Sequence, residues 1–395
     1  MSIFLGFILA FSPVLYAVSG FEAADFQHCQ EKGANFEVIV KNVGQGSCTI
    51  LKNHRNARYV IIDAGTSSDT PEEIVNRIAG TLGIGEVHSD LPEYAGKITA
   101  ITSHSDKDHI NIFAELFSLN TILFQRTTQF ILGDSDQSYL SKQDGKELHE
   151  GVLQRIPAVV SFINEYRKDW LLDSEFLDAQ SLMNPNTFLS ILFVNAGAGS
   201  SYAGNENTNS AVVRLSLNGH NVLIMGDASA IATRRYLVDR KKEIPTAVYQ
   251  HPPRTVQLSI VSHHGAKDED GSNDGFWLNQ KQPRHVAISA GYRYKGHPDL
   301  GLFQEFFLID CLRDTTDDFF HYEDSHPIAI GVSNPEDYEY AKGQLAPDFR
   351  FIDVDTTEKW SIFATKKSIY NTANSGDLRY IFDVDGSLIS FSREY

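Results

Sequence analysis

Short apolar runs separated by glycine-containing turns open the recognisable part of the chain. The segment FEVIVKNVGQGSCTIL (36–51) predicts two strands joined by a turn, and ARYVIIDAG (57–65) predicts a third strand. Because these runs are close neighbours, they predict an antiparallel start to a sheet. The spacing then changes, and Ile74, Ile78 and Leu82 share one helical face. A helix is therefore expected after the third strand.

Later apolar runs predict alternating strands and helices. Residues 97–104 predict a strand, and the pattern from about 112 to 185 is mainly helical. Strands are expected again at 187–194, 210–217, 220–227, 256–265 and 283–291, with further strands near the C-terminus. The run 283–291 is expected to lie beside the run 256–265. This pattern predicts a single α/β domain over residues 36–391, without a linker that divides it.

The N-terminal stretch MSIFLGFILAFSPVLYAVSG is apolar and ends in small residues. Ala17-Val18-Ser19 is typical of a signal-peptidase site, and the apolar run is shorter than the roughly 20 residues of a membrane span. Residues 1–19 therefore predict a signal peptide and a secreted or periplasmic protein. The alternative is membrane anchoring by an uncleaved N-terminus. No later apolar run is long enough to predict a membrane span.

The charge balance limits the partners that the protein can hold. The formal net charge is −17, because 51 acidic residues outnumber 34 lysines and arginines. Such a charge repels polyanions at long range. Tight binding of long duplex nucleic acid is therefore not expected, whereas a small molecule or a single strand held by local groups is compatible with the composition.

The segment TSHSDKDHIN (102–111) follows one of the predicted strands and carries candidate chemistry. It places His104, Asp106, Asp108 and His109 within six positions. A polar turn has no use for two histidines beside two carboxylates, whereas neutral imidazoles and ionised carboxylates are common ligands of divalent metals. The segment therefore predicts part of a metal site.

Two other predicted strands end in residues of the same kind. One runs into Gly226-Asp227, and another runs into His263-His264-Gly265. In open α/β architectures, ligands gather at the carboxyl ends of strands. Three strand ends that carry acids or histidines are therefore expected to converge on one metal-binding cavity.

The order of these motifs resembles the metallo-β-lactamase fold superfamily. Within it, the chain is similar to the soluble domain of ComEC-type DNA-internalisation competence proteins. The resemblance rests on NVGQG, VIIDAG, TSHSDKDHIN, NTNSAVVRL, VLIMGD, VSHHGAK and VAISAGYRYKGHPD, in that order. It implies an αββα sandwich of two mixed β-sheets flanked by helices, with an enlarged region at about 112–185.

The resemblance also implies roles for individual residues. The implied metal ligands are His104 and Asp106 for one ion, Asp108, His109 and His263 for a second ion, and Asp227 as the bridge between them. Asp106 stands where the superfamily usually has a second histidine. This makes the first site richer in oxygen and favours manganese or another hard ion over zinc. One or two divalent ions, zinc or manganese, are therefore expected.

Three residues are expected to act on the substrate. Asp108 has an alternative role as a general base, and His264 and His297 are candidates for contact with the reacting group. For His297, a purely structural role in the loop before Pro298 stays open. Asp63 is expected to brace the metal-binding loops rather than to coordinate.

These observations predict a metal-dependent hydrolase that uses a metal-bound hydroxide, acting on a phosphodiester as a nuclease or nucleotide phosphodiesterase. One alternative is hydrolysis of a lactam, lactone or thioester. Another is a metal-binding or partner-binding pseudoenzyme, because Asn209 and Ser210 stand where the superfamily's third motif has a histidine.

Overall fold

The first three strands pair in the antiparallel order that their close spacing along the chain predicts. In the computed structural model, β1 (Ala34–Val40) pairs with β2 (Thr49–Asn53), which pairs with β3 (Arg58–Ile62). The structure describes residues 34–67, 71–83, 97–119, 121–172, 176–177, 184–201, 204–243, 256–266, 273–291, 297–309, 312, 326–331, 349–355, 360–365 and 367–394.

These strands belong to an eight-stranded mixed sheet with the order β18-β17-β1-β2-β3-β4-β5-β6. Its other strands are β4 (Ile98–Thr102), β5 (Thr127–Leu132), β6 (Val160–Phe162), β17 (Asp377–Asp383) and β18 (Leu388–Glu394). From β3 to β6 the pairing is parallel, because helices connect these strands, whereas β1, β17 and β18 are antiparallel neighbours. The C-terminal strands thus extend the sheet that the N-terminal strands begin.

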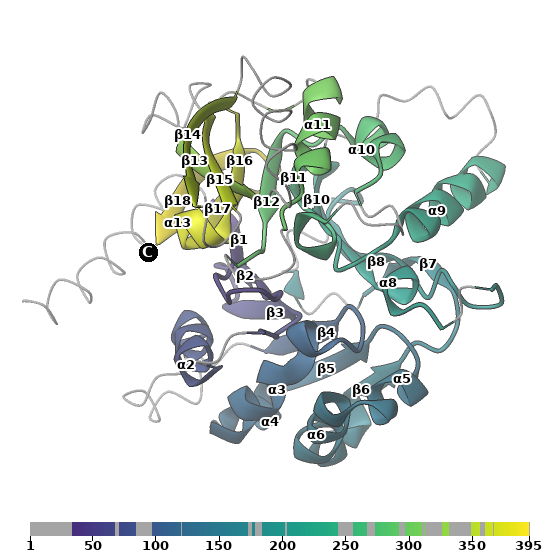
Figure 1. Cartoon of the computed structure of the whole chain (residues 1–395). Coiled ribbons are helices and arrows are strands. Elements are labelled where there is room, and N and C mark those ends of the chain that lie inside the picture. Colours follow the sequence, from purple (N-terminus) through teal and green to yellow (C-terminus); the bar gives the residue numbers. More distant parts are fainter. Residues whose placement is uncertain are drawn as a thin grey trace, which may run out of the picture.

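Helices cover the outer face of this sheet (Figure 1). They are α2 (Pro71–Thr81), α3 (Lys107–Leu119), α4 (Ile122–Arg126), α5 (Asp136–Ser141) and α6 (Gln143–Gly151), followed by the 3₁₀ turns η1 (Leu153–Arg155) and η2 (Pro157–Val159). The predicted helical face is present in α2, where Ile74 and Ile78 are buried. These residues join one apolar cluster with side chains of the sheet, such as Ile50 and Phe130.

The second sheet has seven strands in the order β16-β12-β11-β10-β9-β8-β7. These are β7 (Arg167–Leu171), β8 (Phe188–Val194), β9 (Val212–Leu217), β10 (His220–Ile224), β11 (Val256–Ile260), β12 (His285–Ile288) and β16 (Ile369–Asn371). The helices on this side are α8 (Glu206–Asn209), α9 (Ala230–Glu243), α10 (Gly275–Lys281) and α11 (Leu300–Ile309), with the 3₁₀ turn η4 (His263–Gly265) and α13 (Thr372–Ser375). A small sheet lies beside α13 and contains β13 (His326–Gly331), β15 (Trp360–Thr365) and β14 (Phe349–Asp355).

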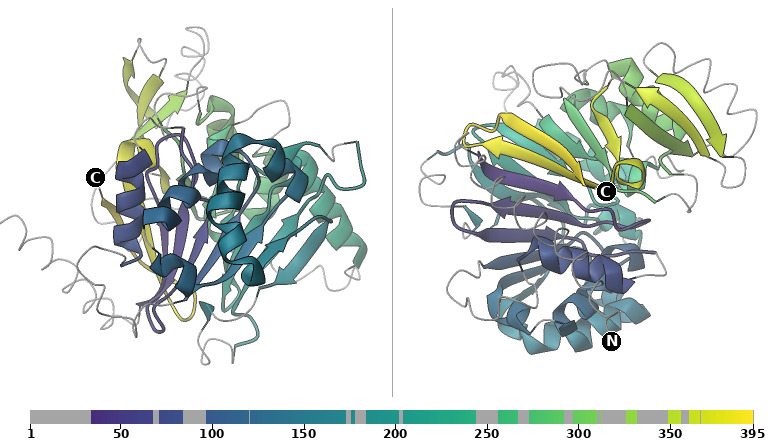
Figure 2. Two further views of the ribbon diagram at one scale, coloured as in Figure 1. Left: turned by 90° about the horizontal axis from the view of Figure 1, so that it is seen from below. Right: turned by 90° about the vertical axis from the view of Figure 1, so that its left-hand side faces the viewer.

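Two mixed sheets therefore face each other, with helices on both outer faces (Figure 2). The largest apolar cluster fills the space between the sheets and joins residues such as Val38 and Ile101 to Val213 and Leu258. A separate cluster packs Trp277 and the neighbouring helices against the second sheet. The predicted αββα sandwich of two mixed sheets is confirmed. The prediction that the run 283–291 lies beside the run 256–265 is also confirmed, because β12 pairs with β11 in parallel.

The prediction of a mainly helical region at 112–185 was incomplete. The region contains several short helices, but it also contains β5, β6 and β7. Only the second half of β5 is apolar, β6 has three residues, and β7 is a polar edge strand. None of them therefore carries a clear two-residue alternation. Residues 1–19, the predicted signal peptide, lie outside the described residues. None of the described helices combines the length and apolarity that crossing a membrane requires.

A buried carboxylate links the first strand to the C-terminal strands. Glu37 on β1 accepts hydrogen bonds from Arg379 Nε at 2.5 Å and from His54 Nε2 at 3.0 Å. Burial alone would raise the pKa of Glu37, but the contacts with His54 and Arg379 lower the pKa from 4.5 to about 2. The ionised form of Glu37 is therefore the form that the fold stabilises.

We expect Glu37 to contribute to the loss of stability in acid. Its pKa is lower in the folded chain than in the unfolded chain, so its contribution is present above pH 4.5 and is lost as the pH falls toward 2. A difference of this size corresponds to about 3 kcal/mol. The free energy of unfolding of Glu37→Gln, measured by urea titration, should be lower than that of wild type at pH 7. It should also depend less on pH between 5 and 3. Glu394→Gln, which alters an exposed carboxylate that also contacts Arg379, should keep the wild-type pH profile.

Candidate metal centre

The three predicted strand ends meet at one edge of the sandwich. β10 and β11 are parallel neighbours, and His263 N donates to the carbonyl of Gly226 at 2.9 Å just beyond their ends. β4 reaches the same place from the other sheet. A Cβ on Gly226 would lie 2.6 Å from Ser103 Cβ, and Gly226 has a φ of 51°. Glycine is therefore needed where the loops from the two sheets pack together at this edge.

The first turn of α3 is held against the loops that follow the N-terminal strands. Ala64 N donates to the carbonyl of His109, and Ser47 N donates to the carbonyl of Asp108. A Cβ on Gly65 would lie 2.2 Å from the carbonyl carbon of Asp108, so a larger residue there would push the helix away. The NVGQG and VIIDAG motifs thus fix the start of α3, which carries Asp108 and His109.

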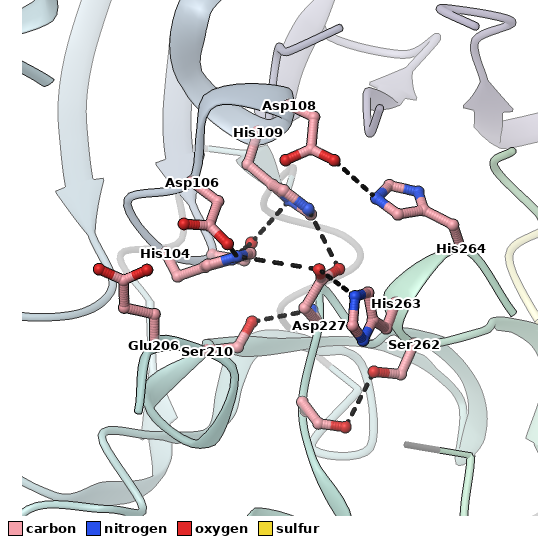
Figure 3. Close-up of polar contacts among 12 residues, drawn as sticks. His104, Asp106, Asp108, His109, Glu206, Ser210, Asp227, Ser262, His263 and His264 are labelled. Atoms are coloured by element: carbon pink, nitrogen blue, oxygen red, sulfur yellow. Dashed lines mark hydrogen bonds and ion pairs between the residues drawn. The ribbon is translucent and has the colours of Figure 1, made fainter. Parts of the chain in front are cut away.

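The carboxylate of Asp227 lies in the middle of a cluster of histidines (Figure 3). Its Oδ1 is 3.1 Å from His109 Nε2, and its Oδ2 is 3.9 Å from His104 Nε2 and 3.7 Å from His263 Nε2. His104 Nε2 is also 3.3 Å from Asp106 Oδ2. Asp227 and His104 are almost fully buried, so these groups face one another without bulk water between them.

A second group adjoins the first one through His109. Asp108 Oδ2 is 3.3 Å from His264 Nε2, and the rings of His109 and His264 are 5.4 Å apart. Ligand atoms of Asp108, His109 and His264 lie within 4.8 Å of one another, as do those of His104, His109 and Asp227. The structure therefore brings two adjoining sets of metal-type ligands together.

Hydrogen bonds on the far side of the rings orient the imidazole nitrogens. Asp63 Oδ2 accepts from His109 Nδ1 at 2.8 Å and from the hydroxyl of Ser103 at 2.8 Å. Because that hydroxyl donates its proton to Asp63, its oxygen accepts from His104 Nδ1 at 3.0 Å. His264 Nδ1 donates to the carbonyl of Ser289 at 2.7 Å. The Nε2 atom of each ring therefore points into the site, and in the neutral form of each ring this is the nitrogen without a proton.

The histidine Nε2 atoms that point into the site provide a test of whether the residues fit a metal ion. Among the described residues, the buried atoms without a hydrogen-bond partner include Nε2 of His104, His109 and His264, together with Oδ1 of Asp227. Lone pairs of imidazoles and carboxylates that face one another repel unless a proton or a metal ion supplies positive charge between them, as a proton on His109 can do toward Asp227. A histidine that donates its other nitrogen to a carboxylate or a carbonyl is the usual form of a metal ligand. The arrangement fits a divalent cation.

The ionisation of the acids supports the same interpretation. Burial alone would raise the pKa of Asp227, but the charges of His109, His263 and His264 hold that pKa well below its usual range. For Asp108, burial also acts to raise the pKa, and the contact with His264 lowers it to about 2. Both carboxylates are thus ionised at neutral pH and attract positive charge.

His263 and His264 stand in an unusual backbone conformation. Their φ angles are 48° and 53°, so two consecutive non-glycine residues occupy the left-handed region. Such conformations cost energy and are concentrated at functional sites. The turn separates the two rings, because His264 points toward Asp108 whereas His263 faces Asp227. The resemblance had placed His263 with Asp108, but the structure places His264 there.

His297 lies at the rim of the cluster. Its ring is 5.6 Å from the ring of His263. The residue after it, Pro298, packs on the histidine turn, because a Cβ on Gly265 would lie 2.6 Å from Pro298 Cβ. Residues 292–296, which precede His297 in the predicted motif, lie outside the described residues. His297 is therefore near the centre, but it is not among the two ligand sets.

Several residues of the site were missed by the sequence analysis. Ser103 and Ser289 orient histidines, and a serine hydroxyl or a backbone carbonyl gives no signal in a motif. Lys142 and Glu206 were also missed. Lys142 Nζ contacts both Asp106 and Glu206. A lysine within a polar break between helices resembles any solvated side chain, so only the tertiary structure identifies it.

Comparisons with known proteins find similarity only among solved structures. No family model and no curated protein matches the chain. A diphosphatase of the PhnP family is 12% identical, with a TM-score of 0.34 over 64% of this chain and 86% of that one. The metallo-β-lactamase SMB-1 bound to 2-mercaptoethanesulfonate is 10% identical, with a TM-score of 0.30 over 62% and 80%. A motif mutant of a metallo-β-lactamase from Cronobacter sakazakii is 14% identical, with a TM-score of 0.28 over 56% and 75%. The interpretation of the site rests on the side chains of this chain.

The contact between Asp63 and His109 leads to a prediction about metal affinity. Asp63→Asn keeps the shape of the side chain but removes the charge that holds His109 Nδ1–H. Loss of such a partner typically weakens metal binding about 10- to 100-fold. The dissociation constant for Mn²⁺ or Zn²⁺, measured by isothermal titration calorimetry, should rise by that factor. Asp169→Asn removes a carboxylate that pairs with Arg214 and Arg240 instead, and it should bind metal as wild type does. An unchanged affinity in Asp63→Asn would contradict the proposed orientation of His109.

Proposed function

We propose that the protein is a metal-dependent hydrolase whose substrate is a phosphodiester, either a nucleotide or a single strand of nucleic acid. The observation that carries the proposal is the convergence of the Nε2 atoms of three buried histidines on ionised carboxylates at the ends of three strands. A structural cluster would satisfy these atoms internally, whereas a metal centre leaves them for the ion.

The residues that would hold metal are those of the two ligand sets. They are His104, His109 and Asp227 in one set and Asp108, His109 and His264 in the other, with Asp106 beside His104 and His263 beside Asp227. The set mixes imidazole, which suits zinc, with several carboxylates, which suit manganese, so it is compatible with either ion. A divalent ion in such a set lowers the pKa of water toward neutrality and polarises the group under attack.

Two residues of the chain are positioned to move protons. Asp108 is ionised, so its carboxylate can accept a hydrogen bond from the attacking water, and it can take the proton of that water once a bound metal has made the water acidic. His297 lies beyond His263 at the rim, so its imidazole can donate a proton to the departing oxygen. A base beside His264 and an acid beside His263 suit in-line displacement at phosphorus.

A phosphodiester is favoured because the motif set, including the His297 element, resembles the competence-protein branch. The net charge of −17 disfavours tight binding of long duplexes. A nucleotide or a single strand of nucleic acid agrees with both the motif resemblance and the net charge.

Hydrolysis and metal binding should both depend on Asp227. Wild-type protein loaded with Mn²⁺ or Zn²⁺ should cleave bis(p-nitrophenyl) phosphate or a single-stranded oligonucleotide. It should not cleave nitrocefin, a lactone or a thioester. Asp227→Asn removes the central charge, so metal content measured by mass spectrometry and turnover should both be lost. Glu72→Gln, an exposed change on α2, should retain both.

Two results would contradict the proposal in different ways. Wild-type metal content and turnover in Asp227→Asn would exclude this centre as the site of hydrolysis. Cleavage of nitrocefin, the lactone or the thioester in preference to the phosphodiesters would retain the centre and replace the substrate class.

The role of His297 can be separated from metal binding by the choice of leaving group. A positioned proton donor typically contributes about 10²- to 10⁴-fold to the rate. His297→Ala should therefore lower kcat on an oligonucleotide by such a factor while metal content is unchanged. The loss should be much smaller on a p-nitrophenyl ester, since p-nitrophenolate leaves without a proton.

His220→Ala provides the matched control. His220 lies at the opposite end of β10, where its ring contacts Gln257, so its removal should not change either rate. Equal losses in His297→Ala on both substrates would assign His297 to binding or structure instead of proton transfer.

A further inference from the structure

A lysine ammonium lies beside the outermost carboxylate of the centre. Lys142 Nζ contacts Asp106 Oδ1 and Glu206 Oε2, so one cation is shared by two acids. The other oxygen of Asp106, Oδ2, is 3.3 Å from His104 Nε2. Figure 3 shows Asp106 and Glu206 on the same side of the cluster, next to His104. The ammonium therefore contacts the carboxylate that the sequence motif assigns to a first metal.

Buried contacts in the fold fix the position of Lys142 beside Asp106. Lys142 separates α5 from α6, and its backbone is extended there. Tyr139 in α5 is buried, and its hydroxyl donates to the carbonyl of Gly133 and contacts Thr102 at the end of β4. A Cβ on Gly145 would lie 2.0 Å from the carbonyl of Tyr139, so glycine is needed for the tight turn between the helices. The position of Lys142 is thus set by packing, not by a flexible loop.

Glu206 is held near the same point from the second sheet. It lies in the first turn of α8, and its Oε1 accepts from Ser105 Oγ at 3.4 Å. Ser105 lies between His104 and Asp106 in the ligand loop. Lys142, Glu206 and the ligand loop therefore form one connected group, supplied by three parts of the chain.

We propose that Lys142 permanently occupies the cation position beside Asp106, so that the centre binds one divalent ion and not two. This inference rests on the proposed metal binding. A divalent ion between His104 and Asp106 would share a carboxylate with the ammonium, and two cations in that arrangement repel each other. An ammonium has no lone pair with which to bind a metal, so the ion is confined to the side of Asp227, His109 and Asp108. Lys142 supplies the positive charge that a first metal would otherwise supply.

The number of bound ions tests this inference without any activity measurement. Purified protein is equilibrated with Mn²⁺ or Zn²⁺, and bound metal per chain is determined by mass spectrometry and calorimetry. Wild type should bind one ion. Lys142→Met should bind two, because Asp106, Glu206 and His104 then become available as ligands. Lys142→Arg, which keeps the charge, should bind one ion.

Three further variants control for location and for loss of charge. Lys146→Met removes an exposed lysine from α6, the helix that follows Lys142, and should bind one ion. Adding Asp106→Asn to Lys142→Met should return the number of ions from two to one, which places the gained ion at Asp106. Lys142→Gln provides a second neutral variant, and circular dichroism verifies that each variant is folded.

The outcomes separate this inference from the proposed function. Two ions in the wild type, or one ion in both folded neutral variants, would overturn the role of Lys142 and leave the proposed hydrolase intact. No bound ion in the wild type would overturn the proposed function and the inference together.

Discussion

The centre depends on a buried carboxylate whose charge has to be neutralised. Asp227 is 3% exposed and faces His104, His109 and His263. An isolated ionised carboxylate is very costly to bury, so positive charge is required in its immediate surroundings. In the metal-free chain, burial acts to lower the pKa of His109, but the charges of Asp227 and Asp63 raise that pKa well above its usual range. A proton and a divalent cation therefore compete for the same negative pocket.

The sandwich maintains this arrangement by bringing the ends of strands from both sheets to one edge. Close backbone approach at Gly226 and Gly65 is the geometric condition for that meeting. The left-handed backbone of His263 and His264 is the energetic cost, since it directs two adjacent rings to two different carboxylates. Packing between the sheets has to offset that cost, which explains why the strands that carry the ligands are buried almost throughout.

The strands that carry the ligands, and the ligands at their ends, could be predicted from the sequence, because strands and strand ends carry local signals. The runs that end in His104, Asp227 and His263 are apolar, and their polar ends identify the ligands. Which histidine faces which carboxylate could not be predicted in the same way. Whether His263 or His264 faces Asp108 depends on two φ angles, and neighbouring histidines look equivalent in a sequence. The strands β5, β6 and β7 were missed because tertiary pairing, not residue alternation, stabilises them.

The role of Lys142 could not be predicted from the sequence for a related reason. Lys142 contacts Asp106 and Glu206, which are 36 and 64 positions away along the chain.

The charge of Lys142 also affects how an anionic substrate can enter the site. Five carboxylates surround the centre, namely Asp63, Asp106, Asp108, Asp227 and Glu206, and Lys142 together with His109, whose pKa is raised, offsets only part of their charge. A phosphodiester that approaches the metal-free pocket would therefore be repelled. A divalent ion reduces that negative charge where it is most deeply buried, while Lys142 does so at the rim. Under the proposed function, a metal that binds first would lower the negative charge that an anionic substrate meets, and Lys142, between α5 and α6, lowers that charge beside Asp106.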